Sequence, residues 1–208
     1  MGGVSRRALL AVLPALFLLL ACEERKQQGG VFNPQQGEYN GIELNKPAYN
    51  FCLKTAGDRT VCLKDILKEK DVVLLFFGYT HCPDVCPAAM YNLQKMMEKL
   101  DEDERKKVQV VFISVDPERD TPDLTDRYAK HFHPSFMGLT GSPEEIAKVA
   151  KKYMVYYKKV EGGSEGGYLV DHTAYIYLIT KDGTLKLIYP TPRQKPELMA
   201  EDVKKILD

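Results

Sequence analysis

The sequence has little net charge, few histidines and no visible internal repeat. Its 208 residues include 29 lysines and arginines against 29 aspartates and glutamates. A nucleic-acid-binding domain carries a basic excess on one face, so this balance excludes nucleic acid as a partner. With 44% hydrophobic and 28% charged residues, the composition is that of a globular protein with a full core. The length suits one domain with short extensions.

The apolar run at the N-terminus, residues 8–21, is short. A helix needs about 20 apolar residues to span a bilayer, whereas this run follows two arginines and leads into Cys22 through the stretch LLAC. Such a pattern is typical of a secretory signal, and its end resembles a bacterial lipoprotein signal. We expect residues 1–21 to be removed and Cys22 to carry a lipid; the alternative is a retained membrane anchor. Either one holds the domain at a membrane, outside the cytoplasm on the periplasmic side.

The rest of the chain divides into a polar segment and a folded domain. Residues 22–46 are polar and rich in Gly and Gln, which predicts a flexible tether, and residues 47–208 form the domain. Hydrophobic patterning predicts its elements in this order: a strand pair at 48–64, a strand at 71–77, a helix at 83–100, a strand at 108–115, helices at 121–131 and 142–153, a Gly-rich loop at 161–167, a hairpin of strands at 173–180 and 184–190, and a helix at 196–207. A right-handed crossover makes the first two long strands parallel. This order predicts an α/β, thioredoxin-like fold with an N-terminal β-hairpin extension.

Two cysteines with three residues between them follow the strand at 71–77, in the stretch GYTHCPDVCP. Cys82 ends a loop and Cys86 lies in the first helical turn, so both sulfurs can reach one metal ion. The positive end of the helix favours thiolates, and we expect both thiols to be unusually acidic. The polar neighbours His81 and Asp84 disfavour the alternative that the pair belongs to the core. The spacing alone does not separate metal binding from disulfide chemistry.

The four histidines limit the choice of a third ligand. His81 adjoins the first cysteine and is expected to point away from it, while His131 and His133 belong to a helix end, where capping explains them. His172 comes just before a predicted core strand, where thioredoxin-like folds usually have a proline that faces the cysteines. We therefore expect its imidazole to face both sulfurs; the alternative is a packed histidine bonded to Asp171.

Two thiolates and one imidazole suit a soft metal, either copper or zinc. Zinc usually takes a fourth ligand or a water. A site with three ligands on a loop favours copper that must be released again, although the residue pattern does not exclude zinc.

Four stretches of the chain resemble the Sco (SenC) family and follow the order found there. They are FFGYTHCPDVCP (76–87), FISVDPERDTP (112–122), FMGLTGS (136–142) and YLVDHTAYIYLI (168–179). The resemblance implies a membrane-tethered protein that binds one copper ion, Cu(I) or Cu(II), through Cys82, Cys86 and His172. It also implies a partner, cytochrome c oxidase subunit II. The protein would deliver copper to the CuA site of this subunit, keep that site reduced, or do both. Other periplasmic copper carriers or thiol reductases are further implied partners.

A thiol–disulfide oxidoreductase is the main alternative. In that reading Cys82 attacks and Cys86 resolves the mixed disulfide, and the acceptor is again the oxidase copper site. The two roles can coexist, because an oxidised pair cannot hold copper. A peroxidase is disfavoured, because Tyr79 rather than threonine stands three residues before Cys82.

Cys52 and Cys62 stand outside the family pattern. They flank a turn near Gly57, and a hairpin symmetric about that residue places them directly opposite each other. Because Phe51 and Leu53 face inward, both cysteines face out on one side. We predict a structural disulfide between them, which an oxidising compartment permits; the alternative is a pair of free surface thiols.

Overall fold

The computed structural model describes residues 2, 37–161 and 167–208. Except for residue 2, the signal expected over 1–21 lies outside these residues, as does the lipidation expected at Cys22. The middle of the Gly-rich loop lies outside them too. Within the described part of the chain, no helix has the length and apolarity that crossing a membrane requires.

A six-stranded sheet lies at the centre of the domain, in the order β1-β10-β9-β4-β5-β6. Its strands are β1 (Ile42–Pro47), β4 (Val72–Gly78), β5 (Val108–Ser114), β6 (Met137–Leu139), β9 (Ile176–Thr180) and β10 (Thr184–Tyr189). The strands β4, β5 and β6 run parallel, and β9 lies antiparallel to β4. Both β4 and β5 are buried along their whole length, as expected of parallel strands that are covered on both faces.

Helices cover both faces of this sheet. The α-helices of the described residues are α1 (Leu63–Glu69), α2 (Val85–Glu98), α3 (Glu102–Lys107), α4 (Pro122–Phe132), α5 (Pro143–Lys152) and α6 (Pro196–Leu207), and the 3-10 turns are η1 (Ala56–Asp58) and η2 (Thr191–Arg193). The arrangement is a thioredoxin-like fold with an N-terminal β-hairpin extension, as predicted.

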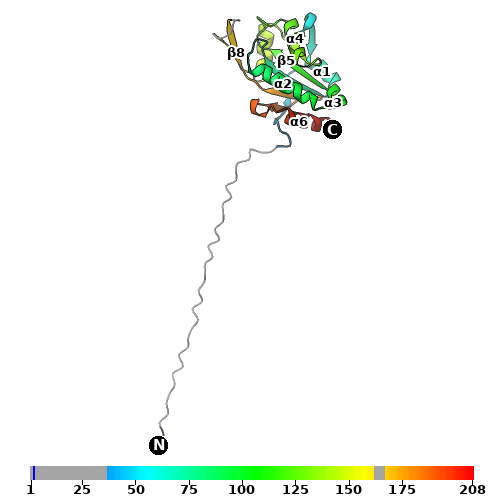
Figure 1. Ribbon diagram of the computed structural model, residues 1–208, viewed down its shortest axis with the longest axis vertical. Coiled ribbons are helices and arrows are strands. Elements are labelled where there is room, and N and C mark those ends of the chain that lie inside the picture. Colours follow the sequence, from blue (N-terminus) through cyan, green and yellow to red (C-terminus); the bar gives the residue numbers. More distant parts are fainter. Residues whose placement is uncertain (1, 3–36, 162–166) are drawn as a thin grey trace. The chain divides into compact units, whose positions relative to one another are not determined.

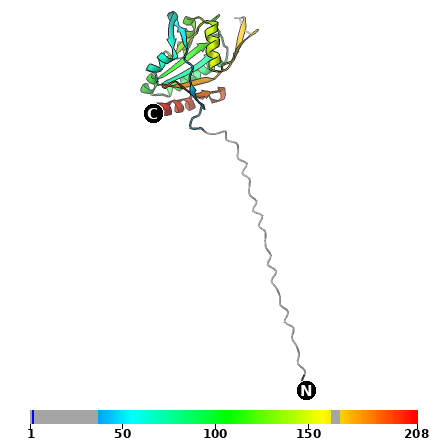
Figure 2. The ribbon, with the colours of Figure 1, turned by 180° about the vertical axis from the view of Figure 1, so that it is seen from behind.

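Alternate residues of β4 face opposite sides of the sheet. Gly78 faces the start of α2, where the sulfur of Cys86 lies against it. Phe77 faces the other side and packs on Tyr153 at the end of α5, with the ring centroids 5.6 Å apart. Figure 1 accordingly shows α2 in front of the sheet, and Figure 2 shows α5 (yellow) in front of it from behind. Both α4 and α6 contact α2.

Two helix starts predicted from local sequence are confirmed. The Thr121 side chain accepts a hydrogen bond from the Leu124 N–H at the start of α4, with Pro122 at its first position. Ser142 and Glu145 form a capping box at the start of α5. These side chains satisfy N–H groups that a helix start leaves without partners, which explains why both boundaries follow from sequence.

Two hairpins lie outside the central sheet. One joins β2 (Cys52–Thr55) to β3 (Arg59–Cys62), and the other joins β7 (Tyr157–Glu161) to β8 (Tyr168–His172). The first was predicted, and the second was not, because its strands are short and mostly exposed. The structure also adds α1, α3 and β6, which are short and have weak periodicity.

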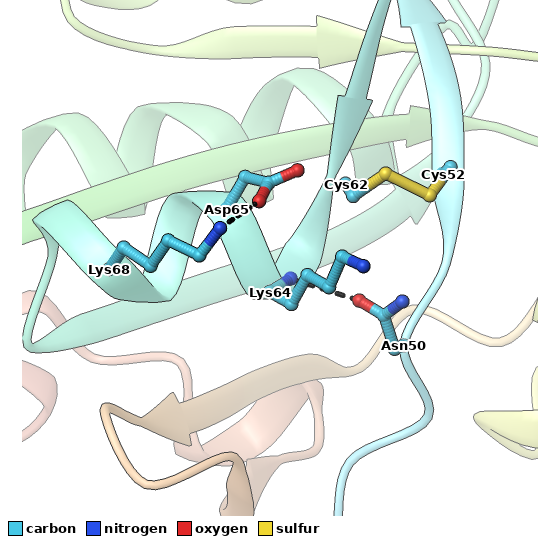
Figure 3. The surroundings of a disulfide bond; sticks show 6 residues. All are labelled: Asn50, Cys52, Cys62, Lys64, Asp65 and Lys68. Carbon is cyan, nitrogen blue, oxygen red and sulfur yellow. Dashed lines mark hydrogen bonds and ion pairs between the residues drawn. A yellow bond between two sulfur atoms is a disulfide. The ribbon is translucent and has the colours of Figure 1, made fainter.

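The disulfide expected between Cys52 and Cys62 is present and joins directly opposite residues of β2 and β3 (Figure 3). Phe51 and Leu53 are buried, as expected if they face inward and the two cysteines face outward. Beside the disulfide, the side-chain oxygen of Asn50 accepts a hydrogen bond from the backbone of Lys64 at 2.9 Å (Figure 3). The segment before β2 thus caps the start of α1.

The boundary predicted for the tether, residues 22–46, is wrong at its C-terminal end. Residues Ile42–Pro47 form β1, which pairs antiparallel with β10 at the edge of the sheet. Most of its residues are exposed or half-buried, so the strand shows little of the hydrophobic alternation that would reveal it. The folded domain therefore begins before residue 42 rather than at residue 47.

Candidate metal centre

The buried member of the cysteine pair is Cys86, the second residue of α2, whose exposed fraction is 0%. Its sulfur lies against the end of β4. A Cβ atom added to Gly78 would be 2.7 Å from this sulfur and 2.9 Å from the ring of Phe112. Glycine at position 78 therefore leaves the space that the Cys86 sulfur occupies.

Cys82 lies in the loop between β4 and α2 and is half-buried. The helix begins at Val85 rather than at the predicted residue 83, because the backbone of Asp84, the N-cap residue, is not helical (φ −140°, ψ −74°). Asp84 makes no side-chain capping bond. Instead, the Cys82 sulfur accepts the backbone N–H of Cys86 at 3.4 Å, so it serves as the capping group of α2.

His172 is the last residue of β8, and its Nε2 atom lies 3.1 Å from the Cys86 sulfur. Its Nδ1 atom lies 3.2 Å from the carbonyl oxygen of Thr173. Since a carbonyl only accepts, Nδ1 is the donor, and Nε2 of the neutral ring keeps its lone pair for a proton or a metal. The rings of Phe76 and Tyr79 pack edge-on against the imidazole at 6.1 and 5.9 Å.

The alternative in which His172 is bonded to Asp171 is wrong. Neighbouring residues of a strand point to opposite sides, and Asp171 is exposed in register with Lys158 of β7. The contacts of the imidazole are instead with the Cys86 sulfur and the Thr173 carbonyl.

The ligand atoms of Cys82, Cys86 and His172 all lie within 4.8 Å of one another. Among the described residues, this is the one group of three or more His, Cys, Asp or Glu side chains close enough to hold a metal. Metal–sulfur and metal–nitrogen bonds of about 2.0–2.3 Å allow three such atoms to share one ion. The donor set fits a soft metal.

The two thiols are electrostatically unlike. A hydrogen bond from the Cys86 thiol, followed by the interaction with the His172 ring and the hydrogen bonds from the backbone N–H groups at the helix start, lowers the pKa of Cys82 to about 4 despite its partial burial. Burial, followed by the hydrogen bond and charge of Cys82, raises the pKa of Cys86 far above that of a free thiol. The prediction of two acidic thiols is thus wrong for Cys86, because desolvation outweighs the helix dipole there.

The other histidines stay outside the cluster. His81 is exposed, and its ring lies near the Thr80 hydroxyl and the Asp120 carboxylate. His133 caps the end of α4, where its Nδ1 atom lies 2.8 Å from the Ser135 hydroxyl. His131 lies in the last turn of the same helix. These positions agree with the roles expected for them.

Sequence reasoning missed two buried carboxylates beside the cysteines. Both belong to the segment 116–120, which reads as a charged turn before the next helix, but Asp116 has an exposed fraction of 1% and Asp120 is fully buried. It accepts hydrogen bonds from the Thr80 N–H and hydroxyl and from the Ser114 hydroxyl. The sequence did contain a usable signal. The turn follows β5 and the cysteine loop follows β4, and these parallel neighbours end at the same edge of the sheet.

The model of the SCO1/SenC family matches residues 49–208. The chain is 33% identical over 208 residues to the SCO2-like protein RC0895 of Rickettsia conorii, covering 94% of this chain and 93% of that protein. It is 50% identical over 109 residues to the mitochondrial protein SCO1 homolog 1 of Arabidopsis thaliana, covering 52% of this chain. That match spans only 32% of the Arabidopsis protein.

Solved structures show the same similarity. Apo Sco1 from Thermus thermophilus is 42% identical, with a TM-score of 0.72 over 81% of this chain and 96% of that one. The copper-bound ScoI of Bradyrhizobium japonicum is 40% identical, with a TM-score of 0.65 over 77% and 99%. BsSco, described as having a disulfide switch and belonging to the Sco family of cytochrome c oxidase assembly proteins, is 27% identical, with a TM-score of 0.59 over 80% and 96%.

Proposed function

Because the chain belongs to the SCO1/SenC family, we propose that it is a copper chaperone which binds one copper ion through Cys82, Cys86 and His172. The copper is cargo, delivered to the CuA site of cytochrome c oxidase subunit II. The observation that carries this proposal is the convergence of three soft ligand atoms within 4.8 Å. A relative of similar fold that contains copper supports the choice of metal.

The ligand set suits a transferable ion better than a structural one. Closed structural zinc sites have four protein ligands, whereas three converge here in the described residues. Thiolate and imidazole ligands suit both oxidation states of copper. Cys82 is half-buried, so one sulfur can be approached by the thiols of an acceptor while Cys86 and His172 still hold the ion.

Copper binding also removes the difference in protonation between Cys82 and Cys86. In the metal-free pair Cys86 keeps its proton, because burial and the neighbouring Cys82 charge oppose a second thiolate. A bound cation supplies the positive charge that a second thiolate needs, so binding and deprotonation of Cys86 occur together.

The proposal extends to the membrane tether. Residues 1–21 act as a lipoprotein-type signal, Cys22 carries the lipid, and the polar residues between Cys22 and the folded domain form the tether. A tether of this kind keeps the domain at the periplasmic face of the membrane that holds the oxidase, where it meets subunit II.

A thiol–disulfide reductase remains the second candidate, and the unequal cysteines favour it. Cys82 is half-buried with a lowered pKa, as an attacking thiol requires, and Cys86 is buried with a raised pKa, as in a resolving thiol. Attack of the Cys82 thiolate on the acceptor's disulfide breaks that bond, releases one acceptor thiolate and forms a mixed disulfide between Cys82 and the other acceptor sulfur. Cys86 then displaces the acceptor thiol and leaves Cys82–Cys86 oxidised.

A transfer experiment tests the proposed function. Protein loaded with one equivalent of copper is mixed with a soluble, metal-free CuA domain whose cysteines are reduced, and the two are separated and assayed for copper. We expect copper to move to the CuA domain and its CuA absorption to develop. A protein that binds no copper, or keeps it, contradicts the proposal.

The same mixture separates the two candidates when the CuA domain starts with its cysteines oxidised and copper is absent. Rapid reduction of that disulfide by the wild-type domain, with weak copper binding, favours the reductase. A Cys86→Ser variant traps the mixed disulfide only in the reductase reaction.

A further inference from the structure

The histidine of the metal centre is carried by a hairpin that does not belong to the central sheet. Among the described residues, strands β7 and β8 pair only with each other, and Figures 1 and 2 both show the hairpin at the margin of the domain. Sheet pairing therefore does not hold His172 near the cysteines. Other contacts must fix the position of the hairpin.

One group of these contacts joins Tyr168, the first residue of β8, to the turn after β5. The Tyr168 hydroxyl donates to Asp116 at 2.7 Å, and Asp116 has an exposed fraction of 1%. The guanidinium of Arg119 lies 3.6 Å from the centre of the Tyr168 ring and donates to its carbonyl oxygen at 3.0 Å. Arg119 also bonds to Asp116. A buried carboxylate, a stacked cation and a phenol thus form one network.

The same turn contacts the other strand of the hairpin through a weaker pair. Lys159 of β7 forms an ion pair with Glu118 and lies 4.8 Å from the centre of the Tyr168 ring. Both charged groups are well exposed, so this pair contributes little. Of the two contacts between this turn and the hairpin, the network of Asp116, Arg119 and Tyr168 is therefore the stronger.

The opposite end of the turn holds the cysteine loop. Asp120 accepts the N–H of Thr80 at 2.8 Å and its hydroxyl at 2.6 Å, two residues before Cys82. Ser114 donates to Asp120 at 2.6 Å and accepts the N–H of Asp116 at 3.1 Å, so both ends of the turn share one hydrogen-bond chain.

We propose that the turn 116–120 sets the distance between the sulfurs and His172, and that Arg119 is a positioning residue for His172. Asp120 fixes the cysteine loop, while Arg119 and Asp116 fix the hairpin. The inference rests on the proposed copper site for its consequence in binding. Loss of the Arg119 contacts frees the nitrogen ligand and leaves the two sulfurs in place.

Lysine cannot replace arginine in this network. It keeps the charge beside Asp116 but has neither the planar face that stacks on Tyr168 nor the fork that reaches two acceptors at once. Arg119→Lys therefore loosens the hairpin, while a cation still lies beside the buried carboxylate of Asp116. Arg127→Lys, at an exposed arginine of α4, is the matched control.

The first measurement needs no metal. Amide hydrogen exchange of the reduced, metal-free protein is compared for wild type, Arg119→Lys and Arg127→Lys. We expect Arg119→Lys to speed exchange in β7 and β8 by about tenfold while β4 and β9 keep their rates, because local opening is governed by local contacts. Unchanged exchange in the hairpin overturns the proposal, whether or not the protein binds copper.

The second measurement is a double-mutant cycle on the Kd for Cu(II), with Arg119→Lys and His172→Ala. If Arg119 acts through His172, Arg119→Lys raises the Kd by about tenfold in the wild-type background and by less than about twofold with alanine at position 172. An equal effect in both backgrounds overturns the proposal. Tyr168→Phe keeps the ring that stacks on Arg119 and loses only the hydrogen bond to Asp116. It must raise the Kd, but by less than Arg119→Lys does.

A wild-type protein that binds neither Cu(I) nor Cu(II) contradicts the proposed function, and hydrogen exchange then decides the role of the turn alone. If the wild type binds Cu(II) but the effects of Arg119→Lys and His172→Ala on the Kd are additive, only the inference about Arg119 is overturned. The two failures are therefore distinguishable.

Discussion

The Nε2 atom of His172 lies 3.1 Å from the sulfur of Cys86, although 86 positions separate the two residues in the chain. One residue ends a peripheral hairpin and the other begins the helix that follows the central strand β4. Because both elements must be in place for this contact, the metal centre is a property of the whole fold rather than of the cysteine motif alone.

Removal of the imidazole is expected to weaken Cu(II) binding strongly. His172→Ala leaves two sulfurs, and the Kd for Cu(II), measured by competition with a chelator, is expected to rise on the order of a hundredfold or more, beyond the effect of losing an outer-shell partner. His131→Ala, on the exposed end of α4, serves as the control. An unchanged Kd and absorption spectrum after His172→Ala contradict ligation.

A methyl group at position 78 is expected to displace the Cys86 sulfur from the metal centre. In Gly78→Ala the new Cβ would lie 2.7 Å from the Cys86 sulfur, so the free energy of unfolding is expected to fall by about 1–3 kcal/mol, as in other overpacked cores. Urea unfolding of the metal-free protein measures it. Gly37→Ala, at an exposed position, is expected to change little, and equal effects of the two substitutions would falsify the close-contact argument.

The Cys52–Cys62 disulfide is expected to add modestly to stability. It closes a short loop, with a sequence separation of 10, so its contribution lies at the low end of about 2–4 kcal/mol. Thermal unfolding of the wild type with and without reductant is compared with that of the Cys52→Ser/Cys62→Ser variant. Reductant must lower the Tm of the wild type and leave that of the variant unchanged; a shift of equal size in both would assign the effect to another group.

The acidity of Cys82 makes metal-free stability depend on pH. Its folded-state pKa of about 4 lies below the value of about 8.5 for an unfolded thiol, so between these values the unfolded state binds more protons. Its stabilising contribution is therefore full above about pH 8.5 and is lost as the pH falls toward 4.

Two readouts follow from this acidity. The stability difference between wild type and Cys82→Ser is expected to shrink as the pH is lowered, and alkylation of Cys82 is expected to keep its rate down to about pH 5. Alkylation that instead falls off near pH 8.5, as for an ordinary thiol, contradicts the assignment.

Copper binding near neutral pH is expected to release about one proton per ion rather than about two. Cys82 is already a thiolate, and only Cys86 still carries a proton that the metal must displace. Calorimetric titration with copper in buffers of different ionisation enthalpy measures the number released. A release of two protons shows that both thiols are ordinary, while affinity that does not weaken in acid excludes thiol displacement.

Much of the layout was predictable because its signals are local. The buried strands β4 and β5 are continuous apolar runs, and the caps at Thr121 and Ser142 are short motifs. The three ligands were predictable for a different reason, since the family motifs mark them individually. By contrast, β1 is an edge strand whose exposed residues resemble a linker.

The properties that remained hidden depend on burial and on contacts distant in sequence. The raised pKa of Cys86 follows from desolvation, which appears only once β4 and α2 are packed together. Asp116 and Asp120 look like surface charges until the hairpin and the cysteine loop are placed against them. Local sequence states which groups are present, and packing decides which of them are buried.

X-ray absorption at the copper edge of the loaded, purified domain identifies the ligands of the copper. We expect two sulfur ligands and one imidazole nitrogen around a single copper, with the nitrogen lost in His172→Ala and one sulfur lost in Cys82→Ser. A copper shell without imidazole in the wild type, or an unchanged shell in His172→Ala, would contradict this ligand set.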